Sequence, residues 1–139
     1  MDHKQRIMEI FEIVSRALVN AKMQKLRKIG AREINLTQFQ YINAINHAED
    51  LTPTSLAKTL KLSKPAVTGI LNKLVEQGYV TKSQSQSDRR VYNIHLTKAG
   101  KQVADAYEEA CREYIDGMAQ ALTASELDQL VILMEKALH

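Results

Sequence analysis

Hydrophobic residues recur at helical spacing along most of this chain, and at strand spacing in one short stretch. Residues 4–28 carry an apolar stripe at intervals of three and four positions, which predicts a long helix that Gly30 breaks. Thr37, with Gln40 three positions later, fits a capping-box pattern, so a second helix is expected to begin there and run to about His47. The stripe of the first helix consists of Ile7, Ile10, Phe11, Val14, Leu18 and Ala21.

Two short helices joined by a tight turn are predicted next, over residues 53–77. Thr52 is a suitable N-cap for the first helix, and Pro53 suits the position after it, where a missing N–H costs nothing. Ser63 is the expected cap of the second helix, and Gly78 stands where helices commonly end. The apolar face of the second helix is formed by Val67, Ile70, Leu71, Leu74 and Val75. Its opposite face is polar, and this arrangement is typical of a DNA-binding helix-turn-helix.

A charged hairpin is expected to follow these helices. Residues 79–82 and 91–96 have the composition of two strands. Residues 83–90 between them are all polar, so the loop has nothing to bury, and its two arginines can reach beyond the helices. His95 alternates with Ile94 and Leu96, which predicts that it points outward from its strand.

The remaining residues predict two more amphipathic helices. Thr97 is the expected cap of a helix over residues 98–121, and Thr123 with Glu126 forms a capping box that opens the last helix. Their apolar stripes consist of Val103, Ala106, Tyr107, Ala110, Cys111, Tyr114 and Met118, and of Leu127, Leu130, Val131, Met134 and Leu138. The outer helices are longer than a small DNA-binding unit needs. A second copy of the chain is the economical way to bury their apolar faces.

Charge is distributed unevenly along the sequence. The formal net charge is only +3, but residues 53–101 contain nine basic side chains and two acidic ones. Residues 102–139 contain two basic and eight acidic side chains. Positive charge is thus concentrated on the predicted helix-turn-helix and hairpin, as a polyanionic partner requires. Taken by itself, the charge also fits an ordinary solvated surface, since basic patches have several uses.

The length and composition favour one ordinary domain. The chain has 139 residues and a single cysteine, which excludes an internal disulfide. Its N-terminus lacks the apolar stretch of a signal peptide, and no apolar run approaches the roughly 18 residues of a membrane span. We therefore expect a cytoplasmic protein without a membrane segment.

The sequence offers little support for catalysis. It has no Gly-rich phosphate loop, no His-Glu-x-x-His pattern and no nucleophile elbow. His47, Glu49 and Asp50 are close in sequence but are weak evidence for a metal site, which needs three or four convergent ligands. Cys111 lies on an apolar stripe, which favours a buried structural cysteine. We expect a protein that is not an enzyme and that uses no metal or other cofactor.

Several short motifs occur together in the order and spacing of one known family. They are Leu36-Thr37 with Gln40, Leu56-Ala57, Ser63 through Val67, Gly78-Tyr79-Val80, Asp88-Arg89-Arg90 and Leu96-Thr97-Lys98-Ala99-Gly100. On these residues the chain resembles the multiple-antibiotic-resistance-regulator (MarR) family, over nearly its whole length. The most specific feature is the combination of a helix-turn-helix, Asp-Arg-Arg, and a strand that ends in Leu-Thr-x-x-Gly.

The resemblance implies a mainly α winged helix-turn-helix with a two-stranded β-wing, flanked by long N- and C-terminal dimerisation helices. Residues 1–139 would form one domain, with dimerisation helices at 1–35 and 101–139 and a DNA-binding winged helix at 36–100. Within the latter, the helix-turn-helix would cover residues 53–77 and the wing residues 79–96. The function it implies is sequence-specific binding of double-stranded DNA by a homodimer, on a pseudo-palindromic operator, to regulate transcription.

Residues of the second short helix are the expected readers of bases in the major groove. Asn can pair with adenine, Lys can reach guanine, and a Thr or Ala methyl group can meet a thymine methyl. In the family, an arginine of the wing enters the minor groove while the aspartate braces an arginine, and Arg89 and Arg90 are both candidates here. Lys82 stands where many members have Arg, and we expect it to contact a phosphate. The expected DNA-binding residues are Ser63, Lys64, Pro65, Ala66, Thr68, Gly69, Asn72, Lys73, Lys82, Asp88, Arg89 and Arg90.

The resemblance also implies a repressor that a small aromatic or amphipathic effector relieves. Such molecules often bind in the family where the dimerisation helices meet the DNA-binding part. The candidate residues here are Val14, Leu18, Ile42, Ile45 and Tyr107, although plain core packing is the alternative role for each. Two other functions remain open at this point: a winged helix used for protein interaction, and an architectural DNA-binding module without an effector.

Overall fold

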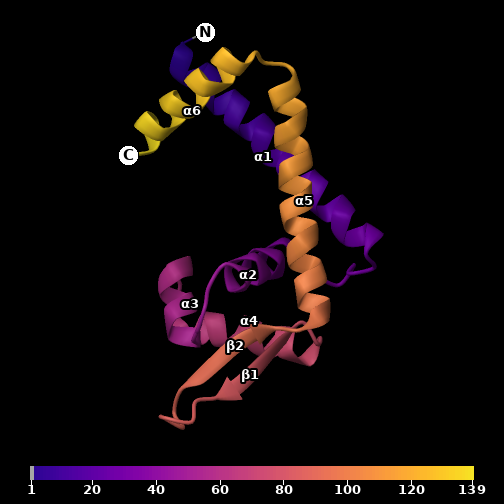
Figure 1. Cartoon of the computed structure of the whole chain (residues 1–139), viewed down its shortest axis with the longest axis vertical. Coiled ribbons are helices and arrows are strands. Elements are labelled where there is room, and N and C mark those ends of the chain that lie inside the picture. Colours follow the sequence, from indigo (N-terminus) through magenta and orange to yellow (C-terminus); the bar gives the residue numbers. More distant parts are fainter. Residues whose placement is uncertain (1) are drawn as a thin grey trace.

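Six helices and one hairpin follow one another along the chain, and the computed structural model describes residues 2–139 (Figure 1). The elements are α1 (His3–Lys28), α2 (Leu36–Asn46), α3 (Pro53–Leu60), α4 (Lys64–Glu76), β1 (Val80–Gln84), β2 (Tyr92–Leu96), α5 (Lys98–Gln120) and α6 (Ala124–Leu138). The order confirms the predicted fold class, a mainly helical winged helix-turn-helix.

The hydrophobic core lies at one end of the molecule, where α2, α3, α4 and the hairpin form a body. Phe39 and Ile42 of α2 and Leu71 of α4 have no exposed surface. Leu26 near the end of α1 and Val103 near the start of α5 are also buried in this core. The two long helices are therefore anchored to the body at one end only, as Figure 1 shows.

The hairpin is antiparallel, and its register runs from Val80 opposite Leu96 to Gln84 opposite Tyr92. The first strand begins one residue later and ends two residues later than predicted. Its start differs because the Tyr79 N–H donates to the Leu74 carbonyl at 3.0 Å and so belongs to the end of α4. The second strand likewise begins one residue later than predicted.

The inner face of the hairpin is fixed to the body. The N–H of Ile94 donates to the carbonyl of Leu51, in the loop between α2 and α3, at 2.8 Å. Ile94 is buried, and the neighbouring His95 is exposed, which confirms the predicted alternation along this strand. This contact determines where the wing projects from the body.

Four of the five predicted N-caps are confirmed. The side chains of Thr52, Ser63, Thr97 and Thr123 each accept a hydrogen bond from the backbone N–H three residues later. The start of α2 was predicted wrongly, because its capping box is made by Asn35 with Gln38, and residue 37 lies inside the helix.

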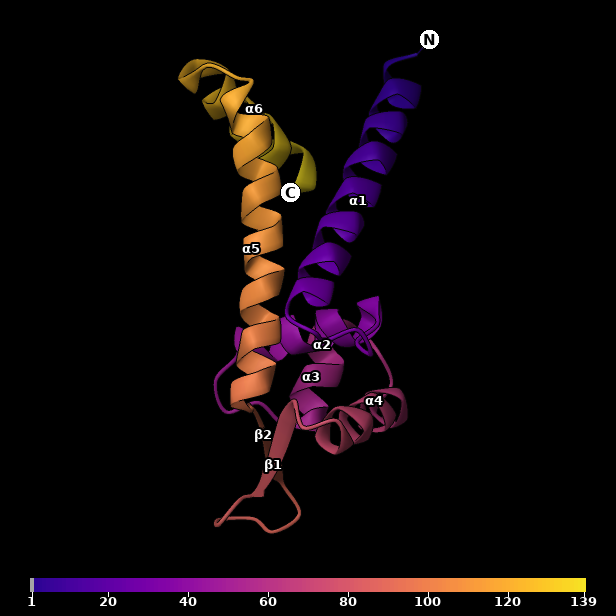
Figure 2. The same ribbon diagram turned by 90° about the vertical axis from the view of Figure 1, so that its right-hand side faces the viewer.

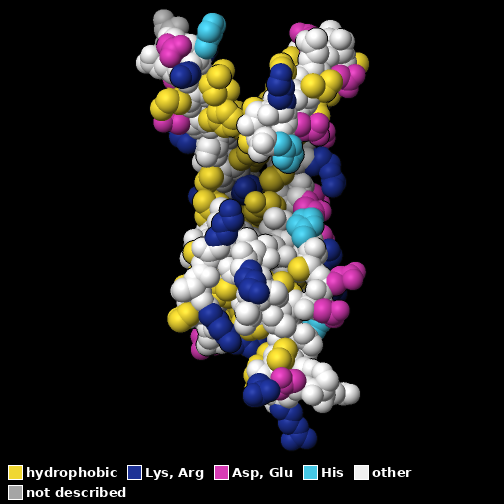
Figure 3. Space-filling model, turned by 90° about the vertical axis from the view of Figure 1, so that its left-hand side faces the viewer, with side chains coloured by type: hydrophobic (Ala, Val, Ile, Leu, Met, Phe, Trp, Pro, Cys, Tyr) yellow, Lys and Arg dark blue, Asp and Glu magenta, His cyan; other side chains and the backbone are white. Residues whose placement is uncertain are grey.

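The two long helices diverge from each other as they leave the body, and α6 turns back from the far end of α5 (Figure 2). The two arms of the molecule are α1 on one side and α5 with α6 on the other. Both arms carry large exposed hydrophobic side chains, and none of the α6 residues is buried. These side chains are Ile7, Met8, Ile10, Phe11 and Ile13 on α1, Ile115 and Met118 on α5, and Val131, Ile132, Leu133, Met134 and Leu138 on α6. Figure 3 shows hydrophobic side chains gathered along the arms.

Two further sequence-based expectations can be compared with the structure. Cys111 was predicted to be buried, but the structure leaves it half-buried. No helix between residues 2 and 139 combines the length and hydrophobicity that a membrane span needs.

Candidate nucleic-acid interface

The helix-turn-helix is held by caps at both of its helices and by a left-handed residue between them. Thr52 and Ser55 form a capping box at the start of α3. Lys61 ends that helix with φ 55° and ψ 44°, a conformation that reverses the chain within a few residues. Ser63 then caps α4 through the N–H of Ala66, at 3.4 Å. The second helix therefore begins where the sequence predicts it.

Helix α4 has one buried face and one exposed face. Val67, Leu71 and Leu74 have no exposed surface and fix the helix on the core. The residues of this segment that were predicted to bind DNA lie on the other side: Ser63, Lys64, Pro65, Ala66, Gly69, Asn72 and Lys73 are exposed, and Thr68 is half-buried. The hydroxyl of Thr68 donates to the Lys64 carbonyl at 2.9 Å, which leaves its methyl group as the part that can contact another molecule.

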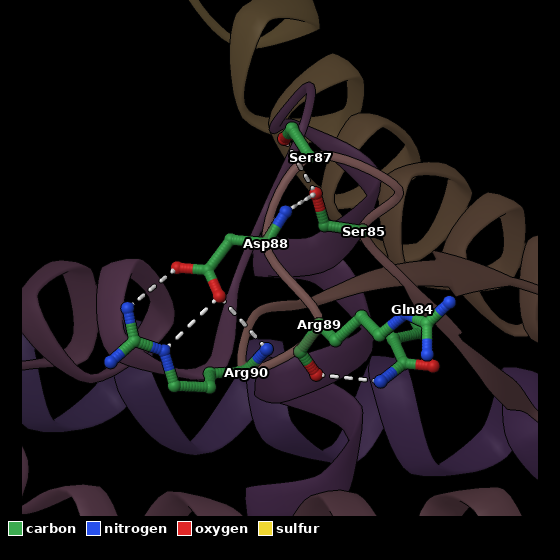
Figure 4. A network of polar contacts seen from close by, with 6 residues as sticks. All are labelled: Gln84, Ser85, Ser87, Asp88, Arg89 and Arg90. Atoms are coloured by element: carbon green, nitrogen blue, oxygen red, sulfur yellow. Dashed lines mark hydrogen bonds and ion pairs between the residues drawn. The ribbon is translucent and has the colours of Figure 1, made fainter.

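The loop of the wing is organised around Asp88. Its Oδ1 accepts from the Arg90 backbone N–H at 3.0 Å and from Arg90 Nε at 3.2 Å, while Oδ2 accepts from the same guanidinium at 3.4 Å (Figure 4). The backbone N–H and then the guanidinium of Arg90 lower the pKa of Asp88. Arg90 is thus the arginine that the aspartate braces in this structure.

The neighbouring Arg89 is held only through its backbone. Its carbonyl accepts from Gln84 Nε2 at 2.6 Å, and its side chain extends away from Asp88 (Figure 4). The structure gives its guanidinium no hydrogen-bond or ion-pair partner within residues 2–139. An exposed guanidinium without a competing carboxylate is available to an external anion.

Lys82 lies at the junction of the wing with α4. Its Nζ donates to Oδ1 of Asn72 at 2.6 Å, and both side chains belong to the predicted DNA-binding set. The sequence did not indicate this contact, because the two residues are on different elements and the pairing depends on how the hairpin packs against the helix. Whether Lys82 also contacts a phosphate stays a prediction.

The end of α4 is tied to the long helices by contacts that the sequence analysis missed. The Tyr79 hydroxyl donates to the carboxylate of Glu33, in the loop between α1 and α2. Burial, followed by this hydrogen bond, raises the pKa of Tyr79 to about 12, and the same bond lowers the pKa of Glu33. Thr97 Oγ1, at the start of α5, donates to the carbonyl of Gly78 at 2.6 Å. These two hydrogen bonds connect the residues that follow α4 to the loop after α1 and to the start of α5.

A second link to α4 runs through the buried Gln38. Its side-chain oxygen accepts from the Asn35 N–H at 3.1 Å, and its Nε2 donates to Gln77 Oε1 at 3.1 Å. One amide thus caps α2 and holds Gln77, the residue that follows the end of α4. The only signal for Gln38 in the sequence was the capping-box spacing from Asn35, which overlaps the Thr37 pattern.

The five residues predicted to bind an effector fall into two groups. Ile42 and Ile45 are part of the core, with 0% and 4% of their surface exposed. Val14, Leu18 and Tyr107 are half-buried, and of these three Tyr107 packs against the core. The ring of Tyr107 packs edge-on against Phe39 of α2, with ring centroids 4.9 Å apart.

Helix α1 completes this junction through Lys22. Its Nζ donates to the Tyr107 hydroxyl at 3.1 Å and lies 4.3 Å from the centre of that ring. Helices α1, α2 and α5 therefore meet at Tyr107. A groove of about 520 Å³ lies nearby between the end of α1 and α5, and its lining of Lys25, Lys28, Ile29, Gln102, Asp105, Ala106 and Glu109 includes none of the predicted five.

Comparison with known proteins identifies relatives along the whole chain. The model of the MarR family matches residues 33–91. The chain is 26% identical over 136 residues to the uncharacterised HTH-type transcriptional regulator YpoP of Bacillus subtilis, covering 98% of this chain and 96% of that protein. It is 27% identical over 124 residues to the multiple antibiotic resistance protein MarR of Escherichia coli, covering 87% and 86%.

The fold also matches a solved structure of this kind. Streptococcus pneumoniae FabT, crystallised in complex with DNA, superposes with a TM-score of 0.83 at 27% identity, over 97% of this chain and 92% of that one. These matches extend over the arms as well as the body, and the relatives named here are regulators, not enzymes. The family model over residues 33–91, the relatives of similar length and the shared fold together show that the chain is similar to proteins of the MarR family.

Proposed function

We propose that this protein is a homodimeric, sequence-specific, double-stranded-DNA-binding transcriptional regulator that works in the cytoplasm. The observation that carries the proposal is the exposed polar face of α4, which lies beside a wing whose Arg89 side chain has no partner within the described residues. Both belong to residues 53–101, which contain nine basic and two acidic residues. A helix of this kind fits the major groove, and the lysines and arginines of residues 53–101 would release counterions from the DNA, which favours binding. FabT, a relative of the same fold, was crystallised with DNA.

Different parts of the chain expose different kinds of side chain, polar and basic on the body and hydrophobic on the arms, and we assign them different roles. We propose that residues 36–100 contact DNA, while residues 1–35 and 101–139 form the dimer through the exposed hydrophobic side chains of the arms. A two-fold dimer places two copies of α4 about one helical turn apart, roughly 10 bp, on a pseudo-palindromic site. The candidate base readers are Lys64, Ala66, Thr68, Gly69, Asn72 and Lys73.

Selection of binding sites from random duplex DNA tests this function. We expect an enriched motif with two inverted half-sites, and an affinity that falls steeply between about 50 and 200 mM salt because several phosphates are neutralised. A winged helix used only for protein interaction would select no motif and show no salt-dependent affinity. An architectural module would bind with the same salt dependence but without a motif.

The wing makes a separate prediction about its two arginines. Arg89→Ala should weaken binding more than Arg90→Ala, by about 1–3 kcal/mol, and should alter preference mainly in A·T-rich flanking sequence, because a narrow minor groove attracts an arginine. Arg90→Ala should act indirectly, since Arg90 is held by Asp88. Titration of both variants against the selected site and a G·C-flanked version measures this. A larger loss for Arg90→Ala would assign the minor-groove contact to Arg90.

We further propose that the protein is a repressor and that a small aromatic or amphipathic ligand releases it from DNA. The junction of α1, α2 and α5 at Tyr107 supports this location, because it connects the arms to the body that carries α4. A ligand there that separates the arms would move the two copies of α4 relative to each other. If the ligand lowers the affinity of the protein for DNA by some factor, linkage requires that DNA lower the affinity of the protein for the ligand by the same factor.

A ligand screen by DNA release tests the proposed effector site. Ligands that release DNA from the wild type should need about ten times higher concentration with Tyr107→Phe or Leu18→Trp, which remove a hydroxyl or fill space at the junction. Tyr92→Phe, on the exposed wing strand, is the matched control and should leave the release unchanged. Equal release from all these proteins would place the ligand elsewhere, with the groove beside Lys25 and Lys28 as the next location to test.

A further inference from the structure

The contact between Lys82 and Asn72 joins the wing to the helix that would read the bases. Ten residues separate them in sequence, and the Nζ–Oδ1 distance is 2.6 Å. Asn72 is exposed and Lys82 half-buried, so the pair lies at the surface proposed above to face DNA. A hydrogen bond from an ammonium group is charge-assisted, and at this length it is a strong one. The pair is therefore formed before any DNA is bound.

This contact determines which way round the Asn72 amide is held. An ammonium group can only donate, so the amide must turn its oxygen toward Lys82. The amide NH₂ group then points away from β1, with two N–H donors that can meet another molecule. In an unrestrained asparagine, the oxygen and the NH₂ group would be free to exchange places.

The fixed orientation changes which base edge suits Asn72. A free asparagine reads adenine with both halves of the amide, because its oxygen accepts from N6 and its NH₂ group donates to N7. Lys82 competes for the accepting half and leaves the donating half free. Its own two remaining N–H groups add donors at the same place. A cluster of donors matches guanine, whose major-groove edge offers the acceptors N7 and O6.

We propose that Lys82 sets the base preference of α4 at Asn72, so that this position favours guanine over adenine. The proposal rests on the proposed function, since it requires α4 to lie in the major groove. Lys82 acts here as a positioning residue, through the amide that it orients. This role differs from the sequence-based expectation of a phosphate contact, which would help all DNA sequences alike.

The experiment compares site selection by the wild type with selection by substituted proteins. Asn72→Ala identifies the base pair that Asn72 reads, as the position where preference relaxes. At that position the wild type should prefer guanine to adenine, and Lys82→Met should shift the ratio toward adenine by about tenfold or more, the scale of a well-formed bidentate contact. Lys82→Arg restores a donor beside the amide and should keep the preference for guanine.

Lys58→Met is the matched control, because it removes one charge from an exposed lysine of α3 that is outside the predicted DNA-binding set and does not touch Asn72. It should affect all sequences alike and leave the ratio unchanged. An equal loss on all sequences with Lys82→Met, or a wild-type preference for adenine, would overturn the inference. If Asn72→Ala relaxed the base preference at no position of the site, the inference would also be overturned. These results would not contradict the proposed function. A wild type that selects no motif would contradict both the proposed function and the role of Lys82.

Discussion

The double substitution Phe11→Glu and Met134→Glu should leave a folded monomer whose DNA affinity is lower by about 100-fold or more. Phe11 on α1 is 57% exposed and Met134 on α6 is 43% exposed, so neither side chain holds the body together. An isolated helix as short as α6 is marginal in water, and α6 buries no residue within its own chain. Its stability must therefore come from burial against another molecule, for which a second copy is the simplest.

The expected loss follows from the geometry of two linked half-sites. When one half of the dimer is bound, the other is held at a high effective concentration near the second half-site, and such linkage raises avidity by roughly 10² to 10⁴. Carboxylates placed within an apolar interface would be desolvated without a counter-charge, which separates the subunits. Sedimentation at micromolar concentration and titration of the selected site measure both effects.

Gln24→Glu provides the matched control for this prediction. It adds the same charge to α1, but Gln24 is exposed and its neighbours one helical turn away are Asn20, Ala21, Arg27 and Lys28, which are not among the large exposed hydrophobic side chains. It should remain dimeric and bind DNA at normal affinity. A dimer that survives both glutamates would show that the arms do not form the interface.

The elements whose ends are fixed by local side chains could be predicted from the sequence. Thr52, Ser63, Thr97 and Thr123 each cap a helix through a residue three positions away, so the signal lies within one turn. The exposed face of α4 was predictable for the same reason. Once the helix begins at Ser63, its periodicity determines which side chains share a face with Asn72.

The start of α2 shows where local signals are ambiguous. Two capping-box patterns overlap there, Asn35 with Gln38 and Thr37 with Gln40, and each is also flanked by apolar residues. The structure uses the first, in which Gln38 is buried and also bonds to Gln77, 39 residues away. Packing against α4 thus decides between two starts that the sequence leaves nearly equal.

The details of the candidate site depend on contacts between distant elements. Lys82 with Asn72 and Glu33 with Tyr79 join residues on different elements, and no periodicity within one element indicates them. The different roles of Arg89 and Arg90 depend on which side chain folds back onto Asp88, and adjacent arginines give no signal about that. The sequence therefore predicts the residues of the interface better than it predicts their orientation.

Gly100→Ala should destabilise the protein by about 3 kcal/mol, the cost of forcing an extra methyl group into a packed site. A Cβ at this position of α5 would lie 2.1 Å from the backbone oxygen of Tyr79 and 3.2 Å from Cδ2 of Leu96. The Tyr79 oxygen cannot move away freely, because it accepts from the Thr97 N–H at 3.0 Å. The methyl group would have to push the start of α5 away from Tyr79, which lies in the segment between α4 and β1.

Thermal unfolding measures this effect against a matched change at Gly69. Gly69 is also helical, and a Cβ there meets nothing within 4 Å, so Gly69→Ala should stabilise the fold by up to ~1 kcal/mol. Gly100→Ala should instead lower the Tm by roughly 10 °C, given the few degrees expected per kcal/mol for a domain of this size. It should also weaken DNA binding at temperatures where it stays folded, because Tyr79 and Thr97 connect α4 to the long helices. A Tm within about 2 °C of the wild type would show that the backbone at Tyr79 can move to accommodate the methyl group. The close packing of α5 against Tyr79 would then not determine the position of α4.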